Sequence, residues 1–263
     1  MPGANARAME KARDLPADAL IFDLEDAVAP AEKETARRQV IETLQKGGYG
    51  NRELVVRVNG LMTPWGEADV AEMATAGAHA LLIPKVENKQ IINGVEGRML
   101  TAQAPDAMSI WCMIETPKGV MRAEEIASAS PRLGALVMGT SDLAKDLHCL
   151  HTPSRGPFMT SLSWCILAAR ANGLSILDGV HLEQDKTTLV IVRPGGTANQ
   201  LPISADWQDW WGQQQYKNRV IFLTGSRDTY QKVLDSARQA RARQSGVAFR
   251  SRGIRPTRPC SRR

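Results

Sequence analysis

The segment "ALIFDLEDAVAP", residues 19 to 30, decides how the chain folds. Its first four residues are apolar and typical of a buried β-strand, and the carboxylates of Asp23, Glu25 and Asp26 follow at once. Asp23 or Asp26 taken alone is equally well explained as a helix cap or a structural hydrogen-bonding group. Together, the three acids predict that this strand ends in a polar site.

The same alternation of apolar and amphipathic segments recurs along the first two thirds of the chain. Apolar runs predict strands at 19–24, 53–58, 79–84, 109–115, 133–139 and 174–178. Helices are expected between them, at 5–15 with Asn5 as N-cap, at 29–48 with Gly47 and Gly48 at its end, and at 65–77. Continuous apolar strands that alternate with helices predict an α/β protein with a parallel sheet.

Polar side chains follow every one of the six expected strands. In chain order they are Asp23, Glu25 and Asp26; Arg57 and Asn59; Lys85; Glu115; Ser141 and Asp142; and Asp178 and His181. Each of them alone has a simple structural explanation, such as an ion-pair partner for Arg57 or a helix cap for Asp142. Because the carboxyl ends of parallel strands share one face, their recurrence predicts an active site there.

These residue types favour metal-assisted chemistry. Glu115 and Asp142 are hard oxygen donors, and two carboxylates with water and a substrate carboxylate make an ordinary magnesium site. Arg57 offers a planar fork for a carboxylate or enolate oxygen. Lys85 is expected to pair with Asp23 or Glu25. Neighbouring carboxylates would keep its amine charged, which disfavours a Schiff base.

Composition argues against several other classes of protein. The 263 residues are 43% hydrophobic and 23% charged, as in ordinary soluble globular domains. The chain has no run of about 18 apolar residues and no apolar signal-peptide core, so we expect no membrane association. Its four cysteines lack C-x-x-C spacing, which favours a reducing cytoplasm over a zinc site or disulfides. Walker, G-x-G-x-x-G and G-x-S-x-G motifs are also missing from the sequence.

Charge divides the chain into two parts. Residues 1–185 carry 18 Lys and Arg against 24 Asp and Glu, a net charge of −6, whereas residues 186–263 carry 15 against 4, a net charge of +11. We predict an α/β domain at 1–185 and a segment of different character at 186–263 with a basic, disordered tail. The tail has no recognisable nucleic-acid-binding module, so we expect no specific nucleic acid partner.

Six ordered motifs carry a family resemblance: "MPGANARAMEKARDLPADALIFDLEDAVAP", "VVRVNG", "LLIPKVEN", "MIETPKGV", "GTSDLAKDL" and "ILDGVHL". Over residues 1 to about 185, the chain resembles the citrate lyase β-subunit-like CoA-ester lyases of the HpcH/HpaI aldolase superfamily. The resemblance implies a TIM-type (β/α)₈ barrel that assembles into homotrimers or hexamers. It also implies magnesium-dependent cleavage of a malyl-, citramalyl- or citryl-CoA to acetyl-CoA and a 2-oxo acid.

The resemblance assigns roles residue by residue. Glu115 and Asp142 match the metal ligands, with Glu115 also beside the substrate, and Arg57 matches the arginine at the substrate oxygens. Asp23, Glu25 and Asp26 match the acidic cluster, and Lys85 matches the lysine paired with it. Pro2 and Gly3 lie in the loop expected near the CoA.

The chain departs from the family pattern at both ends. The family has an apolar strand before Pro2, and a "DGKxxIHP"-type motif beyond about residue 185, and neither is visible here. We therefore expect a barrel that is incomplete or altered at the N-terminal strand and after about residue 185, with 188–194 and 219–225 as substitute strands. Two alternatives remain open: a 4-hydroxy-2-oxo-acid aldolase of the same superfamily, and a catalytically inactive barrel remnant.

Overall fold

The computed structural model describes residues 1–15, 17–152 and 155–180. All of them belong to one compact unit of the chain, Met1–Phe222. His181, the substitute strands expected at 188–194 and 219–225, and the basic tail lie outside the described residues. The division of the chain near residue 185 therefore stays a prediction.

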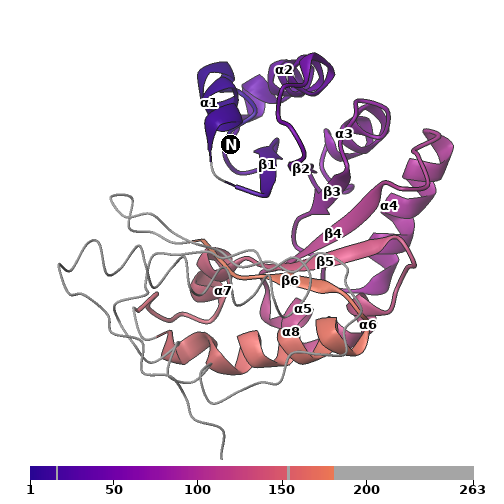
Figure 1. The fold of residues 1–263 in the computed structure, drawn as a ribbon. Coiled ribbons are helices and arrows are strands. Elements are labelled where there is room, and N and C mark those ends of the chain that lie inside the picture. The colour runs from indigo at the N-terminus through magenta and orange to yellow at the C-terminus, as the bar shows by residue number, and fades with distance from the viewer. Residues whose placement is uncertain (16, 153–154, 181–263) are drawn as a thin grey trace, which may run out of the picture. The chain divides into compact units, whose positions relative to one another are not determined.

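The described strands form one parallel sheet in the order of the sequence. They are β1 (Ala19–Asp23), β2 (Glu53–Arg57), β3 (Ala80–Ile83), β4 (Ser109–Ile114), β5 (Leu133–Met138) and β6 (Ser175–Leu177). Each expected strand is confirmed to within two residues at either end. The sheet curls like part of a barrel wall with helices along its outside, so the predicted TIM-type α/β class is confirmed as a curled parallel sheet (Figure 1).

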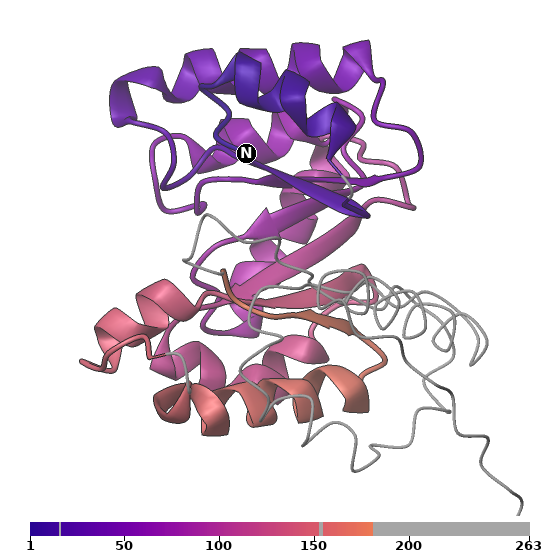
Figure 2. The same ribbon diagram turned by 60° about the vertical axis from the view of Figure 1, so that its left-hand side comes forward.

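Helices follow the strands as the sequence predicts. They are α1 (Ala6–Lys11), α2 (Lys33–Lys46), α3 (Gly66–Met73), α4 (Lys89–Thr101), α5 (Pro117–Met121), α6 (Ala123–Ala127), α7 (Thr140–Asp146) and α8 (Met159–Ala171), with 3₁₀ turns η1 (Ala12–Asp14), η2 (Pro30–Glu32) and η3 (Gly156–Phe158). Asn5 caps α1 by accepting a hydrogen bond from the Ala8 N–H, as expected. Gly47 ends α2 at φ +63°, a left-handed conformation that suits glycine. In two views, α2 and α8 lie near opposite ends of the row of strands (Figures 1 and 2).

Both faces of the sheet are buried, which explains why its strands are apolar throughout. Side chains on the outer face, such as Phe22, Val56 and Leu81, belong to a large core shared with the helices. Alternate side chains point inward and form a second, smaller core of Val55, Ala80, Leu82, Trp111, Met113, Ala135, Val137 and Leu177. Polar side chains begin where this inner core ends, at the carboxyl ends of the strands.

The first residues lie along the edge of β1 that faces away from β2. The Asp23 N–H donates to the Met1 carbonyl at 2.8 Å, and the Gly3 N–H donates to the Asp23 carbonyl at 2.8 Å. Pro2 thereby pairs with Asp23 in a parallel bridge. This short stretch occupies the edge position where the family pattern led us to expect a missing strand.

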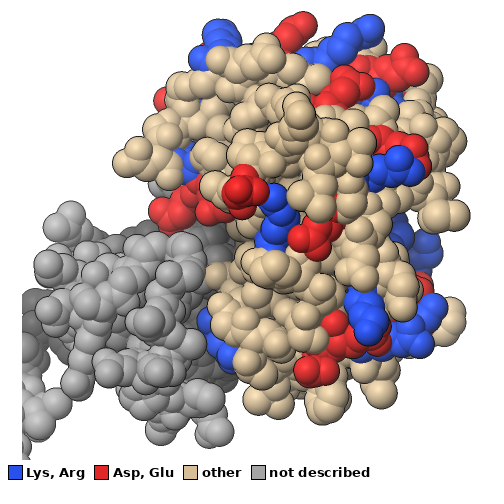
Figure 3. All heavy atoms as spheres, turned by 90° about the vertical axis from the view of Figure 1, so that its right-hand side faces the viewer, with Lys and Arg blue, Asp and Glu red and all other residues tan. Residues whose placement is uncertain are grey.

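The surface of the described residues offers no evident membrane-spanning element. None of their helices is long and apolar enough to cross a bilayer. On the face shown in Figure 3, acidic and basic side chains are interspersed among neutral ones.

Candidate active site

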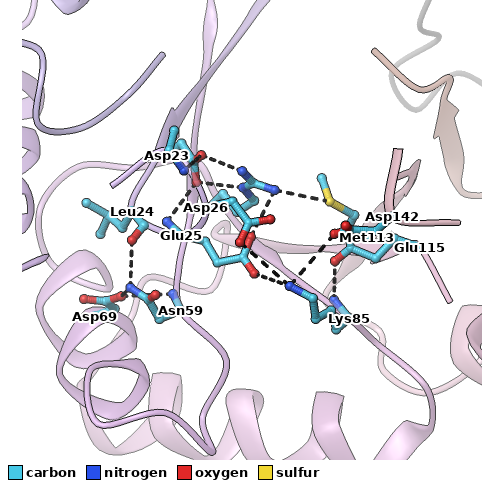
Figure 4. Close-up of polar contacts among 12 residues, drawn as sticks. Asp23, Leu24, Glu25, Asp26, Asn59, Asp69, Lys85, Met113, Glu115 and Asp142 are labelled. Carbon is cyan, nitrogen blue, oxygen red and sulfur yellow. Dashed lines mark hydrogen bonds and ion pairs between the residues drawn. The ribbon is translucent and has the colours of Figure 1, made fainter. Parts of the chain in front are cut away.

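The predicted site residues from five strand ends meet in one cluster. Asp23 and Arg57 end neighbouring strands and lie opposite each other in the sheet register. Lys85 follows β3, Glu115 follows β4, and Asp142 lies in the first turn of α7 after β5. Figure 4 shows Glu25, Asp26 and Asp142 around the Lys85 amine, and Glu115 beside the Lys85 backbone N–H.

Asp23, Glu25 and Arg57 form a buried ion-paired group. Arg57 donates two hydrogen bonds to Asp23, from Nε to Oδ1 at 2.7 Å and from Nη2 to Oδ2. Its third nitrogen, Nη1, lies 3.1 Å from Oε2 of Glu25. Burial works to raise the pKa of Asp23, but the Arg57 hydrogen bond and charge outweigh it and hold that pKa below its usual value. Asp23 is therefore a carboxylate at neutral pH.

Asp23 also shapes the backbone that follows it. Its Oδ1 accepts a hydrogen bond from the Glu25 N–H at 2.9 Å, and its Oδ2 accepts one from the Ala27 N–H at 3.1 Å. Both expectations for Asp23 are thus met, since it is a structural hydrogen-bonding group and a member of the acidic cluster. Asp26 is more exposed, and its carboxylate lies 4.0 Å from the Lys85 amine.

Lys85 links the ion-paired group to the two predicted metal ligands. Its Nζ donates to Oε1 of Glu25 at 2.7 Å and lies 4.0 Å from Oδ2 of Asp142. Its backbone N–H donates to Oε1 of Glu115 at 2.7 Å, from a left-handed conformation at φ +50°. Burial lowers the pKa of Lys85, but Glu25 outweighs that effect and the pKa is raised. The amine is charged, as expected, and poorly suited to Schiff-base chemistry.

Glu115 is a buried carboxylate in a strongly acidic neighbourhood. It is only 2% exposed, and burial raises its pKa to about 7, with further increases from the charges of Glu25 and Asp142. The Lys85 backbone hydrogen bond and amine oppose this shift without cancelling it. Glu115 therefore sits where an additional positive charge would be stabilising.

Asp142 is not the helix cap that its position permits. Gly139 occupies the N-cap position of α7, and no side chain there accepts a capping hydrogen bond. The Asp142 carboxylate, one third exposed, lies at the positive end of this helix and close enough to Glu115 to raise its pKa. The two predicted ligands are therefore on the same side of the protein.

Gly139 leaves the room that Glu115 occupies. A Cβ at this position would lie 2.3 Å from Cβ and 2.6 Å from Oε2 of Glu115. The sequence analysis did not single out this residue. The only signal was its place between an apolar strand and Asp142 in "MGTSD".

The donor set fits a divalent cation. Asp23, Glu25, Asp26, Glu115 and Asp142 contribute five acids, whereas Arg57 and Lys85 contribute two positive charges. Within the described residues no three Asp, Glu, His or Cys side chains converge as a ready-made metal cage. Glu115 and Asp142 alone would leave most coordination positions to water and substrate, as is common for Mg²⁺.

Pro2, Gly3 and Asp178 were also predicted, and each has its own contacts among the described residues. Pro2 and Gly3 pack against the end of β1, where a Cβ on Gly3 would come within 2.9 Å of the Asp23 carbonyl. Asp178, after β6, accepts hydrogen bonds from both terminal nitrogens of Arg155. The sequence analysis missed Met113, whose sulfur lies 3.7 Å from Nη1 of Arg57, and it missed Lys33 and Asp69 behind the ion-paired group.

A curled parallel α/β sheet with carboxylates and cations at the carboxyl ends of its strands is typical of barrel-type enzymes. A family model described as HpcH/HpaI aldolase/citrate lyase matches residues 1–201. The chain belongs to this family, as the motifs in the sequence indicated.

Curated relatives share the region that carries the site. The chain is 50% identical over 181 residues to (3S)-malyl-CoA thioesterase of Cereibacter sphaeroides strain KD131, covering 69% of this chain and 61% of that protein. It is 36% identical over 186 residues to citrate lyase subunit beta of Escherichia coli K12, covering 69% and 62%. It is 37% identical over 153 residues to L-malyl-CoA/beta-methylmalyl-CoA lyase of Rhodobacter capsulatus, covering 56% and 48%. The chain thus spans at most about three fifths of the length of these relatives.

Solved structures support the same fold. The citrate lyase beta subunit from M. tuberculosis, in complex with oxaloacetate and magnesium, matches with a TM-score of 0.55 and 27% identity over 70% of this chain and 77% of that one. RipC from Yersinia pestis matches with a TM-score of 0.57 and 27% identity over 70% and 75%.

Proposed function

We propose that this chain is a magnesium-dependent lyase that splits a carbon–carbon bond of a 3-hydroxyacyl-CoA of the malyl-, citramalyl- or citryl-CoA type. The products would be acetyl-CoA and a 2-oxo acid. The observation that carries the proposal is that Glu115 and Asp142 both approach Lys85, Glu115 at its backbone N–H and Asp142 at its amine, in a cluster with more acids than cations. Two kinds of relative named for a CoA ester, the malyl-CoA thioesterase and the malyl-CoA lyase, support this substrate class over a CoA-independent aldolase.

Glu115 and Asp142 would hold the metal, which would supply Lewis-acid polarisation of the substrate's hydroxyl and carboxylate oxygens. Arg57, fixed by Asp23, would direct Nη1 toward the oxygen that gains negative charge as the enolate forms. Cleavage requires removal of the hydroxyl proton, so a proton acceptor must lie nearby. Oε2 of Glu25 is buried, and its contact among the described residues is the ion pair with Nη1 of Arg57 at 3.1 Å rather than a hydrogen bond, and we assign it this role.

A second candidate reaction is hydrolysis of the thioester. The 50% identity to a malyl-CoA thioesterase favours it, because the identity to the malyl-CoA lyase is lower, at 37%. Both names contain malyl-CoA, but they describe different reactions. Hydrolysis would release a free CoA thiol and malate, whereas carbon–carbon cleavage would release glyoxylate and leave the thioester intact. The two reactions are therefore separable by their products.

The test is to incubate the full chain with (3S)-malyl-CoA and Mg²⁺ and to measure glyoxylate as its phenylhydrazone and free thiol with a disulfide reagent in parallel. The lyase proposal expects glyoxylate without a matching rise in thiol. Thiol release without glyoxylate would replace the lyase with a thioesterase. Absence of both products, also with citramalyl- and citryl-CoA, would favour the inactive barrel remnant. Glu115→Gln serves as the control for activity that does not depend on the site.

We also propose that the chain assembles into a homotrimer or hexamer, as the family resemblance implies. Sedimentation velocity of the full chain tests this proposal. A monomer at micromolar concentration would contradict it.

A further inference from the structure

A buried polar network lies directly behind the ion-paired group. Its members are Lys33 and Arg37 on α2, Asn59 after β2 and Asp69 on α3, and their exposed fractions are 6%, 7%, 3% and 0%. Burial of this many polar groups is costly unless each is hydrogen-bonded, so such a network needs a reason. Leu24, Asn59 and Asp69 are visible beside Glu25 in Figure 4.

The ammonium group of Lys33 binds the backbone at the start of the loop at residues 24–28, which carries Glu25 and Asp26. Its Nζ donates to the carbonyl of Leu24 at 2.8 Å, to the carbonyl of Glu25 at 2.7 Å and to Oδ1 of Asn59 at 2.8 Å. These three bonds use all three ammonium hydrogens. The Lys33 ammonium group therefore has no hydrogen left to donate to a substrate. Its contacts fix the backbone at Leu24 and Glu25.

Asn59 connects the Leu24 carbonyl to Asp69 on α3. Its Nδ2 donates to the Leu24 carbonyl at 2.9 Å and to Oδ2 of Asp69 at 2.6 Å, and its backbone N–H donates to the same oxygen at 2.9 Å. Nε of Arg37 donates to the other oxygen of Asp69 at 2.7 Å. The loop is therefore fastened to α2 and α3 as well as to β2.

Both peptide planes that flank Glu25 are held from two sides. The Leu24–Glu25 peptide accepts from Lys33 and Asn59 through its carbonyl and donates to Asp23 through its N–H. The next peptide accepts from Lys33 and from the Val28 N–H through the Glu25 carbonyl. Because peptide groups are planar, fixing both planes fixes φ and ψ of Glu25 and the direction of its Cα–Cβ bond.

We propose that Lys33 and Asn59 are positioning residues that aim the Glu25 carboxylate at Lys85 and Arg57. This inference rests on the proposed function, in which Glu25 accepts the substrate proton. Nothing in it requires Lys33 to approach the substrate. Loss of Lys33 should loosen the loop and lower turnover while substrate binding changes little.

The test compares Lys33→Met with Arg132→Met in the full chain. Arg132 makes the same kind of contact, from Nη1 to the carbonyls of Pro105 at 2.9 Å and Met108 at 3.2 Å, but it precedes β5 and so lies at the opposite end of the sheet. Amide hydrogen exchange of residues 24–28, followed by mass spectrometry, measures the loop without any substrate. Turnover of the CoA ester that the wild type accepts gives kcat and KM.

We expect Lys33→Met to speed exchange in 24–28 by about tenfold, with Arg132→Met unchanged there. We also expect kcat to fall by about tenfold or more while KM changes by less than about threefold. Exchange at the wild-type rate in this segment would overturn the proposal, as would equal acceleration throughout residues 1–180. If the wild type turns over no CoA ester, the proposed function fails while the exchange measurement still decides whether Lys33 holds the loop.

A variant that does not fold is also informative. Lys33→Gln is shorter and keeps an amide donor, so it is measured under the same criteria if Lys33→Met is insoluble. Should both fail to fold while Arg132→Met folds, the network would support the whole domain rather than the loop, and the positioning role would be wrong.

Discussion

Asp23 and Glu115 stand at or just after the ends of β1 and β4, yet their surroundings treat the two carboxylates in opposite ways. Asp23 receives two hydrogen bonds from Arg57 and two from backbone N–H groups, and its pKa is lowered. Glu115 receives one backbone hydrogen bond from Lys85 and is surrounded by other acids, and its pKa is raised to about 7. The protein neutralises the first carboxylate with its own residues and leaves the second short of positive charge.

This difference indicates which part of the cluster lacks positive charge. A buried acid with a built-in partner is part of the scaffold, because removing the partner leaves an uncompensated charge. A buried acid without enough positive charge is strained in the isolated protein and stabilised by an added ion. The β1–β2 end is therefore a structural support, and the β4–β5 end is where the proposed metal would bind.

The largest effect should come from removing the cation of the supporting end. Arg57→Met leaves Asp23 buried and unpaired, so we expect the free energy of unfolding to fall by about 3–5 kcal/mol. Urea denaturation followed by circular dichroism measures it. Arg98→Met is the matched control, because its ion pair with Glu67 is exposed and should contribute less than about 1 kcal/mol. Equal losses in the two variants would erase the contrast between the two ends.

At the β4–β5 end, we expect substitutions to weaken Mg²⁺ binding rather than to destabilise the fold. Glu115→Gln and Asp142→Asn should weaken Mg²⁺ binding by about 100-fold or more, since outer-shell changes alone cost 10–100-fold. Without Mg²⁺, neither substitution should destabilise the fold as Arg57→Met does, because each removes a like charge. Titration calorimetry with Mg²⁺ and urea denaturation supply the two measurements. Asp146→Asn, on the same helix but exposed, should bind Mg²⁺ like the wild type.

A smaller effect is expected from filling the space beside Glu115. Gly139→Ala would place a methyl group against the Glu115 side chain, so we expect a loss of about 1–3 kcal/mol in unfolding free energy and weaker Mg²⁺ binding. Gly97→Ala in α4 meets no atom within 4 Å and should be neutral or slightly stabilising. Thermal unfolding with and without Mg²⁺ separates the two variants. Unchanged Mg²⁺ binding in Gly139→Ala would show that Glu115 tolerates displacement.

The smallest effect concerns acid. The folded-state pKa of Asp23 lies below its ordinary value of 3.8, so its pairing stabilises the fold above that pH, and the contribution is lost as the pH falls through the folded pKa. Asp23→Asn should therefore show a shallower loss of stability below about pH 4 than the wild type. Urea midpoints measured between about pH 2 and pH 6 test this. Parallel curves for the two proteins would mean that Asp23 does not set the acid response.

The sequence was sufficient for the strands and for the face that carries the site. Apolar runs mark β1 to β6 because both faces of a parallel sheet are buried, and the polar residues after them mark the carboxyl ends. It was insufficient for Lys33 and Gly139. Lys33 lies among charged residues in "AEKE" and has the pattern of an exposed helix start, and only the packing of α2 against Leu24 and Asn59 buries it. The space that Gly139 leaves is likewise a property of two strand ends together.

The left-handed backbone at Lys85 has a mechanical consequence. The same residue holds Glu115 through its N–H and Glu25 through its amine, and φ sets the direction of the side chain relative to the N–H, so a rotation about φ would break at least one of the two contacts. The contacts to Glu115 and to Glu25 therefore depend on the same backbone angle of Lys85. Lys85→Gly would keep the left-handed backbone angle and remove the amine, so this variant would separate the role of the backbone conformation from that of the charge.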